Sequence, residues 1–217
     1  MNNSASFNPL ASPPPHFEFF NFVSAKPIQD TDLIRQLPFI PGLKEILMLG
    51  QVHALEHATV WVLGESDSDQ ITSTSKNHQF DNELLGGLST EQGFYLYGQV
   101  NIASLQRAVL VALQRLTGGE SELAVHPRCG TNVSVGMLLT VGLALGIHLL
   151  LPRGPIEQLL GLGVAATTAA QLAPDLGILA QRYVTTAIPF NLAIEDITVT
   201  HDVWERSAHF VRVRWAD

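Results

Sequence analysis

The stretch VSVGMLLTVGLALGIHLLL, residues 133–151, decides the fold class that we expect. Its 19 residues include no Asp, Glu, Lys or Arg. As an α-helix, a stretch of this length rises about 28 Å, which is close to the hydrocarbon thickness of a bilayer. Charged residues make up only 15% of the 217 residues, against roughly 25% in a typical soluble protein. The sequence therefore predicts a membrane-spanning helix.

A second apolar stretch follows after the short turn PRGP. Pro174 and Asp175 interrupt it, but its many glycines and alanines allow a close approach to the first helix. We therefore predict a two-helix transmembrane hairpin over residues 131–182. The alternative is a buried helical pair in a soluble protein, although so apolar a run is unusual in soluble folds.

Basic residues indicate the orientation of this hairpin. The connecting turn holds only Arg153, whereas Arg128 precedes the first helix and Arg182 follows the second. The positive-inside rule then places both termini in the cytoplasm. Membrane lipid is an expected partner, and a membrane protein complex or a homo-oligomer also fits the sequence. The net charge of −8 argues against nucleic-acid binding, which needs clustered Lys and Arg.

Before the hairpin, residues 31–130 predict a small cytoplasmic α/β domain that carries the metal-binding motifs. A helix can run from Gly42 to about Leu63 without an internal proline. The polar residues 64–92 that follow are typical of a surface loop. At the amino end, the Asn-, Ser- and Pro-rich residues 1–30 predict a disordered leader.

The remaining elements predict a sheet. Residues 93–101, GFYLYGQVN, are typical of a strand, the amphipathic residues 102–116 of a helix, and SELAVH, residues 121–126, of a second strand. Residues 183–217 alternate in polarity, which predicts a C-terminal β-hairpin that packs on the cytoplasmic domain and joins the sheet begun near residue 94. The expected fold class is therefore α+β.

The first candidate functional motif is GQVHALEHATV, residues 50–60. His53 and His57 are one helical turn apart, so both imidazoles can reach one metal ion. Glu56 stands beside His57, where it can orient a ligand or act as general base on a metal-bound water. This H-x-x-E-H spacing is that of the reversed zincin motif. Glu56 is therefore the candidate catalytic residue.

A second motif, AVHPRCGTN, residues 124–132, offers further ligands. His126 and Cys129 lie three residues apart in a tight turn that can present both to one ion. Imidazole and thiolate together suit zinc. With His53 and His57 they make a four-ligand set of three histidines and one cysteine, and zinc is the expected cofactor.

These two motifs, with GFYLYGQV between them and an apolar hairpin after them, resemble a family of uncharacterised membrane proteins found mainly in cyanobacteria. The resemblance covers roughly residues 42–182. The paired motifs are also similar to those of the YqhQ-like bacterial membrane proteins, which are predicted to be metal-dependent. The resemblance implies a bacterial inner or thylakoid membrane and brings no established activity. It implies a shared site on His53, Glu56, His57, His126 and Cys129.

Three interpretations of this site remain open. In the first, three ligands bind zinc, water takes the fourth position, and Glu56 activates that water in a peptidase or amidase. In the second, four protein ligands close a structural zinc site in a non-enzymatic scaffold or assembly protein. In the third, no metal binds and the histidines make hydrogen bonds inside the core. The sequence leaves open whether the protein is an enzyme.

Overall fold

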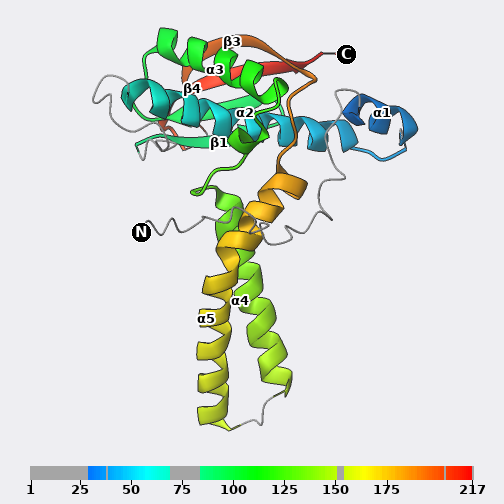
Figure 1. Cartoon of the computed structure of the whole chain (residues 1–217), viewed down its shortest axis with the longest axis vertical. Helices are drawn as coiled ribbons and strands as arrows, with labels where there is room; N and C mark the ends of the chain where they lie inside the picture. Colours follow the sequence, from blue (N-terminus) through cyan, green and yellow to red (C-terminus); the bar gives the residue numbers. More distant parts are fainter. Residues whose placement is uncertain (1–28, 38, 69–83, 151–153, 203, 217) are drawn as a thin grey trace, which may run out of the picture.

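The computed structural model describes residues 29–37, 39–68, 84–150, 154–202 and 204–216. It shows an α+β fold in which helices pack on an antiparallel sheet and two long helices project away from them (Figure 1). The predicted leader lies outside the described residues up to residue 28, and the first helix begins at Gln29.

Eleven helices and strands are assigned within the described residues. In chain order they are α1 (Gln29–Gln36), α2 (Leu43–Ser68), β1 (Gly86–Thr90), β2 (Gly93–Tyr97), α3 (Ile102–Thr117), the 3-10 helix η2 (Ser121–Ala124), α4 (Gly130–Leu150), α5 (Pro155–Ala180), the π-helical turn η3 (Gln181–Thr185), β3 (Leu192–His201) and β4 (Ser207–Trp215).

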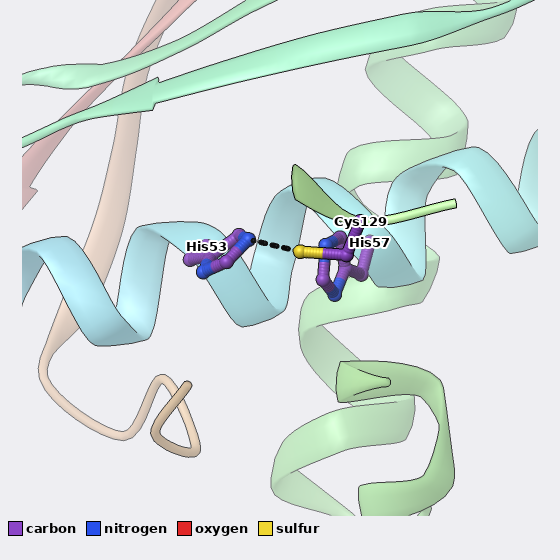
Figure 2. Close-up of side chains that lie close together, drawn as sticks. All are labelled: His53, His57 and Cys129. Atoms are coloured by element: carbon purple, nitrogen blue, oxygen red, sulfur yellow. Dashed lines mark hydrogen bonds between the residues drawn. The ribbon is translucent and has the colours of Figure 1, made fainter. Parts of the chain in front are cut away.

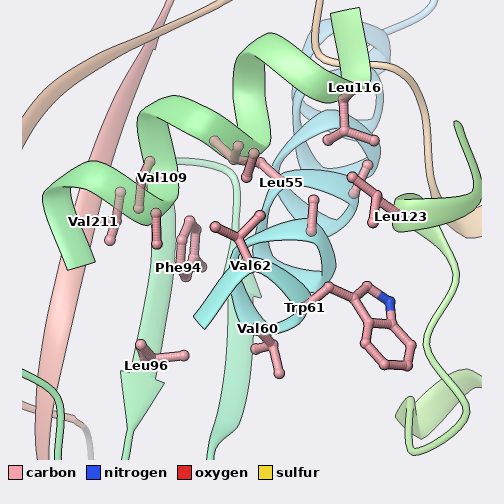
Figure 3. Close-up of a cluster of buried hydrophobic side chains, with 14 of the residues drawn as sticks. Leu55, Val60, Trp61, Val62, Phe94, Leu96, Val109, Leu116, Leu123 and Val211 are labelled. Atoms are coloured by element: carbon pink, nitrogen blue, oxygen red, sulfur yellow. The ribbon is translucent and has the colours of Figure 1, made fainter. Parts of the chain in front are cut away.

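The helix α2 forms the centre of the packed part. It is buried on almost every side over residues 51–64, between α3, η2 and the sheet. Leu55 of α2, Phe94 of β2 and Val109 of α3 belong to the same core, as Figure 3 shows. Burying a large apolar side chain contributes roughly 1.5–3 kcal/mol to folding, so this core fixes the backbone of α2 firmly.

The four strands form one antiparallel sheet in the order β1-β2-β4-β3. The predicted C-terminal hairpin is present as β3 and β4, with Leu192 opposite Trp215. β4 also pairs with β2, where Phe94 lies opposite Val211. The hairpin therefore joins the sheet that begins near residue 94, in agreement with the alternation of its sequence.

Two local predictions are wrong. Residues 121–126 do not form a strand, and η2 occupies their first part. The side chains of His57 and Trp61 donate hydrogen bonds to the carbonyl groups of Ala124 and Val125, so this backbone is satisfied without a strand partner. In addition, β1 lies inside the predicted loop, because pairing with β2 outweighs the low strand propensity of its two glycines.

The helices α4 and α5 pack side by side and project from the rest of the molecule (Figure 1). The residues that α5 buries are all small, namely Gly161, Ala165, Ala169 and Gly177. Small side chains at four-residue spacing let two helices approach closely, as the sequence indicated. The predicted interruption at Pro174 is not a break, because α5 continues through it.

Three helices are long and apolar enough to cross a membrane: α2, α4, and α5 together with η3. Most of α2 is buried inside the fold, which accounts for its apolar composition. By contrast, no residue of α4 is buried, and Leu138, Leu149 and Leu159 are among the many exposed apolar side chains of α4 and α5. So large an apolar surface is rare on soluble proteins and typical of membrane contact.

Candidate metal centre

One side of α2 carries both histidines of the first motif. The ring centroids of His53 and His57 lie 4.3 Å apart, and Glu56 is buried between the helix and β1. Because the core holds α2 on its other sides, the one-turn spacing of the two rings is fixed by the backbone.

The third donor comes from the turn that leads into α4. The N–H of Cys129 donates to the carbonyl of His126 at 3.2 Å, and the Cys129 Sγ lies 3.3 Å from the His53 Nε2 (Figure 2). The ligand atoms of His53, His57 and Cys129 all lie within 4.8 Å of one another. Ligands of a tetrahedral zinc ion are about 3.3–3.8 Å apart, so this group is close to the required geometry.

Backbone carbonyl groups orient both imidazoles. The His53 Nδ1 lies 2.9 Å from the carbonyl oxygen of Thr185, and the His57 Nδ1 lies 2.7 Å from that of Ala124. A carbonyl only accepts, so each Nδ1 must carry the proton. In a neutral imidazole the Nε2 then keeps its lone pair, which is the form that binds a metal ion.

The environment of Cys129 favours the thiolate. Burial alone would raise the pKa of this thiol, but the neighbouring His57 side chain and the hydroxyl and N–H of Thr131 outweigh burial and hold the pKa below its usual value. The N–H of Thr131 lies 3.4 Å from the Sγ. A thiolate is the form in which cysteine binds zinc.

Glu56 has the opposite shift. Burial raises the pKa of this carboxyl above its usual value, although the hydrogen bond from Ser89 and the nearby His53 side chain act in the other direction. The Ser89 hydroxyl of β1 donates to the Glu56 Oε2. Gly87, also on β1, leaves the space into which the Glu56 side chain extends. A carboxyl of raised pKa next to metal-type ligands is typical of a catalytic site.

His126 lies next to this group but is not part of it. Its ring packs against Trp61, with centroids 4.8 Å apart, and against His57 at 5.6 Å. Its Nδ1 accepts a hydrogen bond from the backbone N–H of Arg128 at 3.3 Å, and the ligand-type atoms that lie within 4.8 Å of one another are those of His53, His57 and Cys129. The structure therefore brings together three of the four predicted ligands, with Glu56 beside them.

A cavity of about 600 Å³ opens beside the three ligands and Glu56. Its walls come from α2, from residues 85–89 at β1, from the turn at 126–131 and from the end of η3. It lies where the α4–α5 hairpin leaves the packed part of the molecule. Its lining is mainly apolar, with the polar groups gathered at the metal-type ligands, as is common in ligand sites.

Sequence reasoning missed several groups that shape this site. The carbonyl groups of Ala124 and Thr185 have no signal in the sequence, because any residue carries one. Gly87 and Ser89 lie in a segment whose polar composition predicted a loop, so their approach to Glu56 could not be foreseen.

Comparisons with known proteins cover the segment that contains this site. Residues 48–197 match the family described as Domain of unknown function (DUF6391). An uncharacterized protein from Picosynechococcus sp. is 51% identical over 197 residues, which is 91% of this chain and 94% of that protein. No solved structure matches the chain. The resemblance to an uncharacterised family with a cyanobacterial member is thus confirmed.

Proposed function

The chain belongs to the DUF6391 family, and we propose that it is a membrane-anchored, zinc-dependent hydrolase of peptide or amide bonds. The observation that carries this proposal is the presence of three zinc-type ligands and a buried carboxylate at one cavity. Three protein ligands leave the fourth tetrahedral position open, as catalytic zinc sites require. The cavity offers a substrate access to that position.

His53, His57 and Cys129 would hold the ion, which supplies a Lewis acid and lowers the pKa of water. Glu56 lines the same cavity, and its raised pKa makes it a stronger proton acceptor than an ordinary carboxylate. The oxygen of a water molecule adds to the substrate carbonyl carbon, Glu56 passes the proton of that water to the leaving nitrogen, and the C–N bond breaks. Ser89 holds the Glu56 carboxylate in place.

The exposed apolar surfaces of α4 and α5 support a transmembrane hairpin. Arg128 and Arg182 lie at its base, whereas its connecting turn holds only Arg153. The positive-inside rule then puts the packed part and both termini in the cytoplasm. The cavity, at the base of the hairpin, would face the cytoplasmic surface of the bilayer, and lipid would surround the hairpin.

Metal content and turnover of the detergent-purified protein test this proposal. We expect about one zinc per chain by mass spectrometry, lost in the His53→Ala/His57→Ala double variant and retained in the matched control His201→Ala, whose histidine lies on β3. We expect Glu56→Gln to keep zinc and to lose cleavage of a mixed fluorogenic peptide library by at least about a hundredfold. Full cleavage by Glu56→Gln with its zinc intact would exclude the hydrolase.

A structural zinc site is the second candidate function, favoured by the elements that the cluster joins. His53 and His57 belong to α2, Cys129 precedes α4, and the carbonyl partner of His53 belongs to η3. Zinc would then tie α2 to the hairpin in a scaffold protein. In that case Glu56→Gln should be silent, while His57→Ala should lose zinc and lower the melting temperature.

A further inference from the structure

The strand β1 is an edge strand in the described part of the chain. It pairs with β2 on one side, and the sheet order β1-β2-β4-β3 assigns no described strand to its other side. In an edge strand, the N–H and C=O groups of alternate residues point away from the sheet and can pair with another chain.

The pairing pattern identifies which residues of β1 point outward. The N–H of Val213 on β4 donates to the carbonyl of Gln92. Because hydrogen-bonded pairs alternate along an antiparallel ladder, the backbone N–H and C=O groups of Phe94 and Leu96 also point toward β4. The backbone N–H and C=O groups of Tyr95 and Tyr97 then point the other way, toward β1.

The register carries this alternation across to β1. Leu88 lies opposite Tyr95 and Gly86 lies opposite Tyr97, so these two residues of β1 pair with β2. Gly87 and Ser89 therefore direct their backbone N–H and C=O groups to the outer side.

This outer side borders the cavity of the metal centre. Five consecutive residues, 85–89, line the cavity. Gly87 and Ser89 turn one face of β1 toward Glu56, and the residues between and beside them also line the cavity, so the backbone of β1 forms part of its wall. His53, Glu56 and Cys129 line the same cavity.

We propose that the outer edge of β1 binds an extended apolar peptide as an added strand and thereby places a peptide carbonyl at the metal centre. This inference rests on the proposed hydrolase and names its substrate class. Strand addition supplies affinity through main-chain hydrogen bonds, and neighbouring pockets read alternate side chains. Ile46, Leu88 and Val184 are exposed apolar residues of the cavity wall and would lie next to apolar residues of the peptide.

The first test measures binding to the zinc-loaded, full-length Glu56→Gln protein in detergent, so that the probe is not cleaved. The probe is a fluorescein-labelled heptapeptide of alternating valine and alanine, and its partner is the same peptide N-methylated at its five central amides. Methylation keeps the side chains and removes the main-chain donors. We expect the methylated peptide to bind at least tenfold more weakly by fluorescence anisotropy. Equal binding within twofold would overturn the edge pairing.

A pair of variants locates the binding surface. Leu88 is 37% exposed and lines the cavity, whereas Leu84 is 85% exposed and is not among the residues that line it. We expect Leu88→Lys to weaken binding of the unmethylated heptapeptide at least fivefold and Leu84→Lys to change it by less than twofold. Equal effects of the two variants would contradict docking at the edge.

Cleavage of the unmethylated heptapeptide by the wild-type protein, followed by mass spectrometry, separates this inference from the proposed function. Methylation-sensitive binding without cleavage would support the docking edge and count against the hydrolase. Cleavage of the peptide, combined with equal binding of the methylated and unmethylated forms, would support the hydrolase and overturn strand addition at β1.

Discussion

At the scale of single residues, two backbone carbonyl groups decide what the two histidines can bind. The backbone carbonyl groups of Thr185 and Ala124 each accept a hydrogen bond from the Nδ1 of one imidazole. The Nε2 atom of each ring therefore keeps its lone pair, and both rings belong to the cluster with Cys129. Those lone pairs are the donors that a metal ion would need, so the two carbonyl groups hold both rings in the tautomer that the proposed zinc site requires.

Gly87 gives a prediction at this scale. A Cβ on Gly87 would overlap the Glu56 carboxylate, whereas a Cβ on Gly86 would meet nothing within 4 Å. We expect Gly87→Ala to displace Glu56 and to reduce peptide turnover by about a hundredfold, the cost of moving a catalytic group by roughly 1 Å. Zinc content by mass spectrometry should be unchanged.

The neighbouring glycine is the matched control for that prediction. Gly86→Ala should keep both the turnover and the melting temperature of the wild type, because its methyl group points into open space. If both variants lose turnover equally, β1 tolerates alanine at neither position, and the contact with Glu56 does not explain the loss of turnover in Gly87→Ala.

The proximity of the three candidate ligands could be predicted because their side chains and spacing carry the signal. His53 and His57 at one-turn spacing, with Cys129 in a turn, are brought together as the sequence suggested. The place of His126 could not be foreseen, because it depends on the aromatic contact with Trp61 and on a backbone donor within its own turn.

At the scale of elements, Asn132 connects the base of the hairpin to the turn that carries Cys129. Its side chain donates to the carbonyl of Pro127 at 2.7 Å and accepts from Gln181 at 2.7 Å. The Gln181 side chain also accepts from the backbone N–H of His126 at 2.8 Å. The crossing of α4 and α5 therefore helps to position the turn that carries Cys129.

Gly177 makes this crossing possible, which leads to a second prediction. A Cβ at Gly177 would lie 3.1 Å from the Cα of Asn132 and closer still to its side chain. Overpacking of this kind costs about 1–3 kcal/mol. We expect Gly177→Ala to lower the melting temperature in detergent by roughly 2–10 °C.

Gly163 provides the comparison within α5. A Cβ there would meet nothing within 4 Å, so Gly163→Ala should leave the melting temperature unchanged or raise it slightly, because alanine favours a helix. A loss of the same size at both positions would mean that α5 resists any added methyl group, regardless of its contact with α4.

The turn between β3 and β4 gives a third prediction, about acid stability. Asp202 is buried, and burial alone would raise its pKa. The backbone N–H groups of Arg206 and Trp204, the Arg206 guanidinium and the Tyr97 hydroxyl outweigh burial and hold the pKa of this carboxyl well below its usual range. Between the folded and unfolded pKa values, the unfolded chain binds more protons, so stability rises with pH there.

The stability contributed by Asp202 should therefore be complete above about pH 4, near the ordinary value for this carboxyl, and fall as the pH drops toward the folded pKa. We expect the melting temperature of the wild type to decrease more steeply below that pH than the melting temperature of Asp202→Asn. If the melting temperatures of the two proteins fall in parallel as the pH is lowered, the Asp202 carboxylate does not determine the loss of stability in acid.

Most elements could be predicted where one helix or strand carries its own pattern, as in α3 and the β3–β4 hairpin. The exceptions depend on contacts with other elements. β1 exists because β2 pairs with it, and η2 replaces a strand because side chains of α2 satisfy its carbonyl groups. No local pattern in residues 86–90 or 121–124 records those partners.

At the scale of the whole molecule, the hairpin and the cavity share one end of the fold. The 21 residues of α4 rise roughly 32 Å, enough to cross the hydrocarbon of a bilayer. α5 and η3 together run for 31 residues, so their last turns extend beyond that thickness to Thr185, which faces His53. If the hairpin spans the membrane, the cavity and its cluster of His53, His57 and Cys129 must lie at the surface of the bilayer.

The orientation of this arrangement gives the last prediction, tested with single cysteines in a Cys129→Ser background. Ile156 at the start of α5 is 70% exposed, and Val199 on β3 is 62% exposed, so each accepts a cysteine without a change in the core. In intact bacterial cells, a membrane-impermeant maleimide should label Ile156→Cys, because the proposed orientation places the tip of the hairpin outside. Val199→Cys should react only after lysis, because the positive-inside rule, applied to the basic residues at the base, places the packed part in the cytoplasm in the proposed orientation. The reverse pattern would invert the topology, and labelling of both in intact cells would show that the hairpin does not cross the membrane.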